Sequence, residues 1–252
     1  MLTLKALQSH FKNKGITLKT NYIGPFRKVP ERNYNITGPS KPSKIGTQGE
    51  NAYQILISDF LYNKGTLLKK VNEWYKINFD GWGIEINTIS KPDYKMELTR
   101  DNPKFNINIR DVGEGMSQAL PLVVSAFLNY PEKLLTIIEQ PELHLHPGAH
   151  GSLAELFAYA TLENDHHFLI ETHSQNFILR IRRLIAEGKL NKDSVVIYSV
   201  EYDEDQNTSS LNEITITDTG AVSHWPENVF SESLDETIAI RTAQILKEEN
   251  GN

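Results

Sequence analysis

The stretch that most constrains the fold is residues 134–147, which reads LLTIIEQPELHLHP. An apolar run leads directly into the carboxylate of Glu139, and Pro141 then ends the extended pattern. A short apolar run that stops at a breaker is typical of a strand buried in a parallel sheet. Open α/β sheets bind their ligands at the carboxyl ends of such strands. The sequence therefore puts an acidic group at a ligand-binding edge, where a metal ion or a polar network has to balance its charge.

The sequence from residue 111 onward predicts the rest of this sheet and the helices that connect its strands. Helical spacing of apolar residues alternates with short apolar runs, which indicates right-handed crossovers and an α/β fold with a parallel sheet. The expected elements are a helix over 116–129, strand 134–139, helix 148–162, strand 167–171, helix 175–187 and strand 195–200.

The residues before 110 follow a different pattern. Helical spacing gives way to period-two alternation, which predicts a small helical and antiparallel segment on the N-terminal side of the parallel sheet. The expected elements are a short helix over 2–11, helices over 51–62 and 67–75, and strands 83–88, 94–99 and 105–109. Residues 33–49, rich in Gly, Pro, Ser and Lys, are expected to form an exposed loop.

We accordingly divide the chain into three segments. Residues 1–110 form an N-terminal segment with the basic loop, and residues 111–200 form the α/β lobe. Residues 201–252 form a hairpin and an acidic tail that ends in a helix over 234–247.

Composition narrows the function classes. The chain has no cysteine, which excludes disulfides, thiolate zinc sites and cysteine nucleophiles and favours the cytoplasm. The longest apolar run, 119–128, is too short to cross a bilayer, and the first residues lack a signal-peptide pattern. The net charge of −6 hides a basic start and an acidic end. No basic run is dense enough to predict a nucleic-acid site, and solvated surface charge is the simpler interpretation.

Groups that can do chemistry follow consecutive predicted elements. A glycine-rich turn that opens a helix presents free N–H groups to an anion, a carboxylate can hold Mg²⁺, and a histidine can hydrogen-bond a phosphate oxygen. Together they describe part of a nucleoside triphosphate site. The three groups are Glu139, Gln140 and Glu142; Thr172, His173 and Ser174; and Gly113, Gly115, Ser117 and Gln118.

These strings resemble a known set of motifs. DVGEGMSQALPLVV resembles a diverged ABC-type signature, LLTIIEQPELHLHP a Walker B strand with a D-loop, and FLIETHS an H-loop. Their order and spacing are similar to the C-terminal half of ABC-type ATPases of the structural-maintenance-of-chromosomes (SMC) and overcoming-lysogenization-defect (OLD) kind. EQPELHLHP, ETHSQNFILRIRRLIAEG, YIGPFR and WPENVF are most similar to a bacterial branch of AAA ATPases often found among defence genes.

The resemblance implies roles for individual residues. Glu139 takes the place of the Mg²⁺-coordinating acid, and His173 that of the switch histidine that senses the γ-phosphate. Gly113, Gly115, Ser117 and Gln118 take the place of the signature loop, which meets the nucleotide held by a second subunit. Gln140 stands where most relatives have a catalytic glutamate. An amide can orient water but cannot accept its proton, so hydrolysis should be slow, or Glu142, Glu171 or a phosphate oxygen acts as the base.

One family motif is missing. No G-x-x-x-x-G-K-[ST] occurs in the sequence, so the cradle for the β- and γ-phosphates is not supplied by these residues. The resemblance places that P-loop on an N-terminal lobe. We therefore expect a C-terminal lobe that is inactive alone and hydrolyses ATP with Mg²⁺ only with a P-loop-bearing lobe or second ATPase subunit, in a homo- or heterodimer. DNA and an effector protein are the further partners that the resemblance implies, and no membrane is expected.

Other interpretations stay open. The missing P-loop and Gln140 fit a non-catalytic regulatory or scaffold module of an ATPase complex. GMSQA resembles the nucleophile elbow of a serine hydrolase, with Ser117 as nucleophile and His173 as base, although a polar turn intervenes where the elbow needs a strand. His144 and His146 form an H-x-H pattern, for which shaping the turn is favoured over metal binding because no third ligand is suitably spaced. The histidines at 150, 166 and 167 are expected at the surface, and Arg27, in a predicted loop, is not expected to reach a phosphate.

Overall fold

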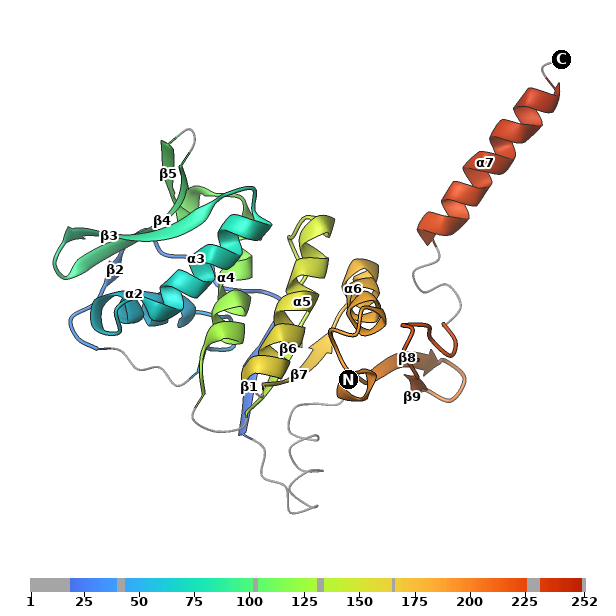
Figure 1. The fold of residues 1–252 in the computed structure, drawn as a ribbon, viewed down its shortest axis with the longest axis horizontal. Coiled ribbons are helices and arrows are strands. Elements are labelled where there is room, and N and C mark those ends of the chain that lie inside the picture. The colour runs from blue at the N-terminus through green and yellow to red at the C-terminus, as the bar shows by residue number, and fades with distance from the viewer. Residues whose placement is uncertain are drawn as a thin grey trace. The chain divides into compact units, whose positions relative to one another are not determined.

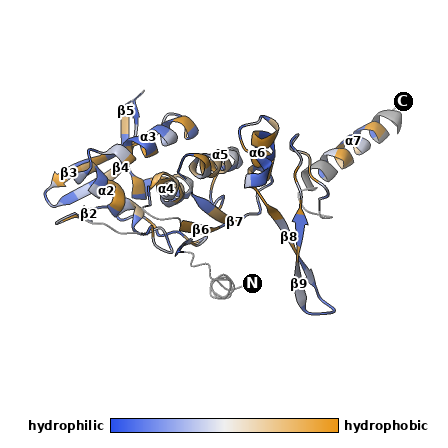
Figure 2. Ribbon diagram, turned by 60° about the horizontal axis from the view of Figure 1, so that its bottom comes forward, coloured by the Kyte–Doolittle hydropathy of each residue, from blue (hydrophilic) through white to orange (hydrophobic). Residues whose placement is uncertain are grey.

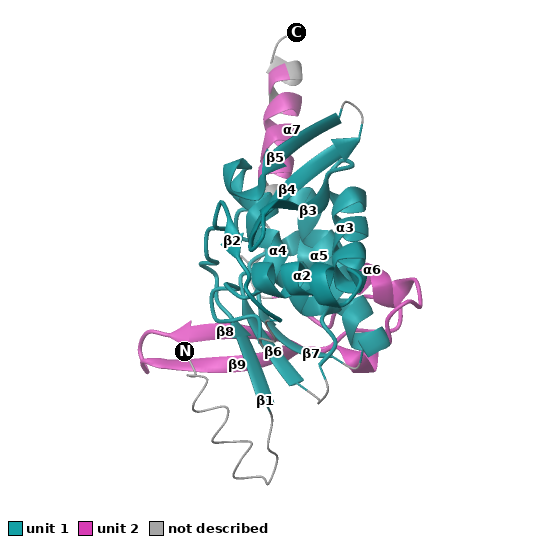
Figure 3. Cartoon of the chain, turned by 90° about the vertical axis from the view of Figure 1, so that its left-hand side faces the viewer, with its two compact units in different colours: residues 1–180 teal, residues 181–252 magenta. Residues whose placement is uncertain are grey.

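The computed structural model describes residues 19–39, 44–101, 104–130, 134–164, 166–225 and 232–250. The helix expected over 2–11 and most of the WPENVF string lie outside these ranges. The chain divides into two compact units, Met1–Arg180 and Ile181–Asn252 (Figure 3). The division into three segments stays a prediction.

The parallel sheet of the first unit has β6 (Leu134–Glu139) between β1 (Lys19–Ile23) and β7 (His167–Glu171). Both pairings are parallel, with Ile23 opposite Ile138 and Glu139 opposite Glu171. Leu134 and Ile138 are buried, and Figure 2 colours this strand mainly as hydrophobic. The α/β fold with a parallel sheet is therefore confirmed, and β6 is the buried strand that its apolar run predicts.

The third strand of this sheet differs from the prediction. Residues 195–200 were expected to supply it, but β1 from the N-terminal region takes that place. The prediction failed because KTNYI mixes polar and apolar residues, and pairing with a distant strand leaves no local signal. The N-terminal region therefore contributes directly to the edge that carries Glu139.

Two helices of the first unit lie beside the parallel sheet: α4 (Glu114–Phe127) and α5 (Pro147–Asn164) (Figure 1). A third, α6 (Gln175–Ala186), begins in the first unit and continues into the second. Each begins within two residues of its predicted start. Within α4, every residue from Ser117 to Ala126 is buried.

Tyrosines from neighbouring helices donate to two carbonyls of α4, one of which is left without its helical donor by a proline. Pro121 has no N–H to donate to the carbonyl of Ser117, and its ring crowds that carbonyl. The hydroxyl of Tyr53 donates to Ser117 O at 3.2 Å, and that of Tyr75 donates to Met116 O at 2.6 Å. Burial raises the pKa of both tyrosines far above the usual value, so both remain donors.

The tyrosines come from the helical and antiparallel segment that the sequence predicts. Its helices are α2 (Ala52–Tyr62) and α3 (Thr66–Asn78), and its antiparallel sheet contains β2 (Tyr34–Asn35), β3 (Gly83–Ser90), β4 (Asp93–Asp101) and β5 (Lys104–Asn108). The short helix η1 (Ile109–Asp111) follows β5 and leads into α4. This segment thus supports α4 from the side and delivers the chain to its first turn.

The second unit contains η2 (Lys192–Ser194), a hairpin of β8 (Ile197–Asp203) and β9 (Thr208–Ile214), and α7 (Glu232–Asn250). The hairpin and the tail helix were both predicted. β8 pairs with β9 in antiparallel register, not as a further strand of the parallel sheet. Among the described residues, no helix is long and apolar enough to span a membrane.

Candidate nucleotide site

The carboxyl ends of the three parallel strands bring acidic and hydroxyl groups together. Glu139 ends β6 and lies opposite Glu171, which ends β7. The hydroxyl of Tyr22 on β1 donates a hydrogen bond to Glu139. Burial raises the pKa of this hydroxyl, and the hydrogen bond and the negative charges of Glu139 and Glu171 raise it further. The predicted metal ligand, Glu139, is thus at the sheet edge with a second carboxylate beside it.

The turn after β6 has an unusual backbone. Gln140 has φ of 44° and His144 has φ of 66°, both in the left-handed region that non-glycine residues rarely adopt. Gln140 N donates to Glu171 O at 2.9 Å, which carries the pairing of β6 with β7 one residue past the strand. Leu143 N then donates to Gln140 O at 3.1 Å. Such strain costs about 1–3 kcal/mol per residue and persists only where surrounding contacts hold it.

Glu142 connects this turn to the segment after β7. Its Oε1 accepts from the backbone N–H of His173 at 2.7 Å, and its Oε2 is buried with no hydrogen-bond partner among the described residues. The side chain of His173 is largely exposed, and its Nε2 lies 3.0 Å from Glu171 Oε1. The structure therefore brings together Glu139, Gln140, Glu142 and His173, the residues predicted from two separate motifs.

The predicted signature loop opens α4. Gly113 is the exposed N-cap, and a Cβ added there would meet nothing within 4 Å. Ser117 and Gln118 are buried: Ser117 Oγ donates to Glu114 O, and Gln118 Nε2 donates to Arg27 O. Gly113 is thus open to a ligand in this structure, whereas nucleotide contact by Ser117 and Gln118 stays a prediction.

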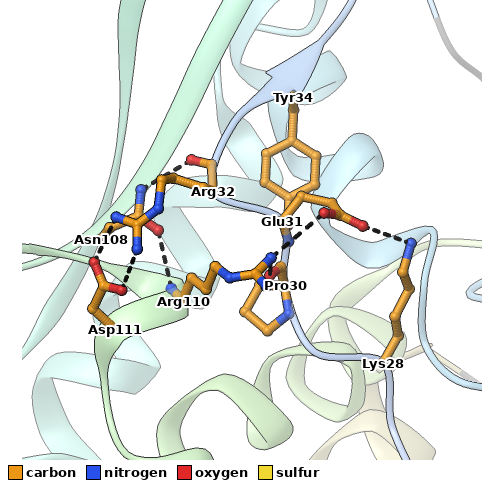
Figure 4. Close-up of polar contacts among 8 residues, drawn as sticks. All are labelled: Lys28, Pro30, Glu31, Arg32, Tyr34, Asn108, Arg110 and Asp111. Carbon is orange, nitrogen blue, oxygen red and sulfur yellow. Dashed lines mark hydrogen bonds and ion pairs between the residues drawn. The ribbon is translucent and has the colours of Figure 1, made fainter.

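A surface network holds the segment just before the signature loop (Figure 4). Arg32 binds both carboxylate oxygens of Asp111, at 2.8 and 2.6 Å. Arg110 donates to the carbonyl of Pro30 and lies 3.6 Å from Glu31. Since these pairs are exposed, each contributes little free energy, but together they fix the register of residues 28–34 against 108–111.

Sequence reasoning set Arg27 aside as a loop residue, but the structure buries it against the turn after β6. Its side chain is 4% exposed, and its guanidinium donates to the carbonyls of Gln140 and Leu143. Burial lowers the pKa of the Arg27 guanidinium to about 10, although the negative charge of Glu142 acts to raise it. The one available signal was its position at the end of YIGPFR, because an arginine buried by distant segments leaves no periodic pattern.

Two histidines expected at the surface are not there. His166 is 6% exposed. His150 is half-buried, with Nδ1 2.7 Å from Ser174 Oγ and Nε2 3.1 Å from Leu145 O. The sequence predictions for these residues are wrong because the segment before β7 and the first turns of α5 pack inward. His150 joins the end of the β6 turn to the residue that caps α6.

The contacts of the other candidates fit a structural role. His144 Nδ1 lies 3.2 Å from Glu114 Oε2, and His146 Nδ1 accepts from Gly148 N. Across the described ranges, no group of three or more His, Cys, Asp or Glu side chains is arranged to hold a metal ion. Nor does a hydrogen bond join Ser117 to His173 in those ranges, as a serine hydrolase would need.

Residues 19–180 match the profile of the family described as "AAA domain, putative AbiEii toxin, Type IV TA system". The chain belongs to this AAA family. The matched region contains every residue of the site described above. A search of curated proteins finds no match to this AAA-family chain.

Solved structures similar to this AAA-family chain include SMC heads, each at 13% identity. One, described as "Structural biochemistry of ATP-driven dimerization and DNA stimulated activation of SMC ATPases", has a TM-score of 0.47 over 71% of this chain and 94% of its own. The Smc head domain with a coiled coil and joint from Pyrococcus yayanosii has a TM-score of 0.45 and covers 62% of this chain and 28% of its own. The Smc head domain from Pyrococcus furiosus, with an extended coiled coil and bound to the C-terminal domain of ScpA, has a TM-score of 0.44. The match covers 75% of this chain and 42% of that one.

Proposed function

We propose that this chain supplies the catalytic edge of an ATP·Mg²⁺ site in an ABC-type ATPase, and that a P-loop-bearing lobe supplies the phosphate cradle. The observation that carries the proposal is the group of contacts at the ends of β6 and β7. Glu139 and Glu171 are in register, Gln140 binds the backbone of Glu171, and Glu142 binds the backbone of His173. Motifs far apart in the sequence thus meet at the sheet edge where α/β proteins bind ligands.

The residues present fit Mg²⁺ bound together with a nucleotide. Mg²⁺ keeps several waters and is held by one or two carboxylates plus substrate phosphates. Glu139 would hold the ion, with Glu171 beside it, and the phosphates of the nucleotide would complete the shell. When bound, Mg²⁺ would neutralise charge on the phosphate oxygens.

The chain's own groups divide the remaining work. Gln140 can orient an attacking water through its amide, but it has no site that accepts the proton. Glu171 lies beside the imidazole of His173, with its Oε1 3.0 Å from His173 Nε2. Glu142 is engaged with the His173 backbone through one oxygen. We therefore assign Glu171 as the proton acceptor and expect slow turnover.

The signature loop is proposed to act across a dimer interface. The N-cap Gly113 is exposed, and the N–H groups of Glu114 and Gly115 precede the first helical hydrogen bonds of α4, so they can bind the phosphate of a nucleotide held by a second head. Coupling of such a dimer to DNA or to a defence effector rests on the family relationship alone.

Calorimetry tests this proposal. ATP with Mg²⁺ is titrated into the chain alone and into the chain mixed with a P-loop-bearing lobe from a member of the same AAA family. We expect micromolar binding in the mixture and none in the chain alone. Micromolar binding by the chain alone, or none in the mixture, would overturn the proposal.

One specific observation favours a second function. Because Gln140 replaces the usual glutamate, the chain also fits a regulatory head that closes on ATP without hydrolysing it. ATP binding by the mixture together with turnover no faster than that of a Glu139→Gln mixture would select this function.

A further inference from the structure

We propose that Arg27 is a positioning residue that, together with Glu142, links the signature helix α4 to Gln140 and His173. The inference rests on the proposed function for its catalytic consequence. Its structural part, the link itself, stands on the contacts of the described residues.

The link begins at Gln118 of α4. Its Nε2 donates to the backbone carbonyl of Arg27 at 3.1 Å, which fixes this arginine on the helix. The guanidinium of Arg27 then reaches the turn after β6, with Nη1 3.4 Å from Gln140 O and Nη2 3.3 Å from Leu143 O. A planar guanidinium can serve two carbonyls in this way, whereas a lysine ammonium is a single point donor.

The second half of the link is Glu142. Its Oε1 accepts the N–H of His173, so the turn that Arg27 holds also fixes the backbone of the switch histidine. The charge of Glu142 acts on Arg27 in the direction that keeps the guanidinium protonated. One arginine thus supports Gln140 directly and His173 through Glu142.

Polar atoms without partners gather around this link. Within the described residues, Arg27 Nε, Gln118 Oε1 and Glu142 Oε2 are buried and make no hydrogen bond. One is a donor and two are acceptors, so a small joint shift of α4 and the turn could satisfy them in a new arrangement. Because an unsatisfied buried polar group costs about 1–3 kcal/mol, this arrangement is suited to a part that moves.

A separate contact joins α4 to the same turn. A Cβ at Gly115 would lie 2.7 Å from His144 O, so the helix backbone packs directly on the turn, and Glu114 Oε2 lies 3.2 Å from His144 Nδ1. With contacts at its first residues and at Gln118, α4 cannot shift without moving the turn. A nucleotide engaged by Gly113 would therefore act on Gln140 and His173.

Amide hydrogen exchange on the isolated chain tests the link. We expect Arg27→Lys to accelerate exchange at Leu143 and His173 about five- to tenfold, the effect of losing one hydrogen bond, while β3 and β4 keep wild-type rates. Lys28→Gln is the matched control, because Lys28 is the neighbouring cation but is half exposed and paired with Glu31; it should leave all rates unchanged. Unchanged exchange in Arg27→Lys, or faster exchange throughout the unit, would overturn the link.

A pair of Glu142 variants approaches the link from its other end and serves if Arg27→Lys does not fold. Glu142→Gln keeps an oxygen for the His173 N–H and should preserve its protection, whereas Glu142→Ala should lose it. Equal exchange in the two variants would contradict the assignment.

In the mixture with the P-loop-bearing lobe, Arg27→Lys should lower kcat while leaving KM for ATP within about twofold, because positioning acts after binding. A change in KM alone would count against the coupling. If the wild-type mixture has no turnover, the proposed function fails, but the exchange results still decide whether the link exists.

Discussion

Gly115 gives a direct test of the contact between α4 and the turn after β6. A Cβ built at this glycine lies 2.7 Å from the backbone oxygen of His144 and 3.6 Å from Leu145 Cδ2. Real Cβ atoms do not approach a carbonyl oxygen that closely, and a backbone atom cannot swing away as a side chain can. Gly115→Ala must therefore push α4 away from the turn.

The size of the effect follows from two opposing terms. Forcing an extra methyl into a packed site costs about 1–3 kcal/mol. Alanine gains about 0.5–1 kcal/mol over glycine within a helix, less near its start. We expect a net loss of about 1–2 kcal/mol in the free energy of unfolding, which at a urea slope of about 2 kcal/mol/M lowers the midpoint by about 0.5–1 M.

Urea unfolding followed by circular dichroism measures the shift. Gly38→Ala is the matched control, because nothing lies within 4 Å of its Cβ position and its φ is not in the left-handed region; its midpoint should stay at or slightly above wild type. A Gly115→Ala midpoint equal to that of Gly38→Ala would refute the close approach of the two segments.

Two further predictions concern single side chains. Tyr53→Phe removes the donor to the Ser117 carbonyl that Pro121 cannot serve, so it should lower the free energy of unfolding in urea by about 1–2 kcal/mol. The control Tyr62→Phe, at an exposed position, should lower it by less than about 0.5 kcal/mol. Hydrogen bonds from Lys189 and then Arg183 lower the pKa of Glu187 from 4.5 to about 2. Because the folded-state pKa is lowered, the stabilisation by Glu187 is complete above pH 4.5 and is lost as the pH falls toward 2. Relative to Glu187→Gln, the wild type should therefore lose free energy of unfolding across that window. A difference between the two proteins that does not change with pH would contradict the assignment.

The fold was most predictable where the sequence pattern is local. The run from Leu134 to Glu139 and the strand from His167 to Glu171 have the predicted bounds, because an apolar run next to a breaker fixes a strand without help from distant residues. The strand Lys19–Ile23 was not placed in the sheet, since its pairing depends on residues more than a hundred positions away.

The same distinction holds for the site. Glu139, Gln140, Glu142 and His173 stand in recognisable strings, and the structure brings them together. Arg27 was passed over, because only tertiary packing buries its side chain. His150 was placed at the surface for the same reason, although it binds Ser174 and the Leu145 carbonyl. Residues that position others leave weaker sequence signals than the residues they position.

The most direct test of the account is ATP hydrolysis by the mixture of this chain with a P-loop-bearing lobe, measured for wild type, Glu139→Gln and Lys28→Gln. Glu139→Gln keeps the shape of the side chain but removes the charge that would hold Mg²⁺, whereas Lys28 lies outside the site in an exposed ion pair. We predict slow but measurable turnover for wild type and Lys28→Gln, and a loss of about a hundredfold or more for Glu139→Gln. Turnover in Glu139→Gln equal to wild type would contradict the central claim.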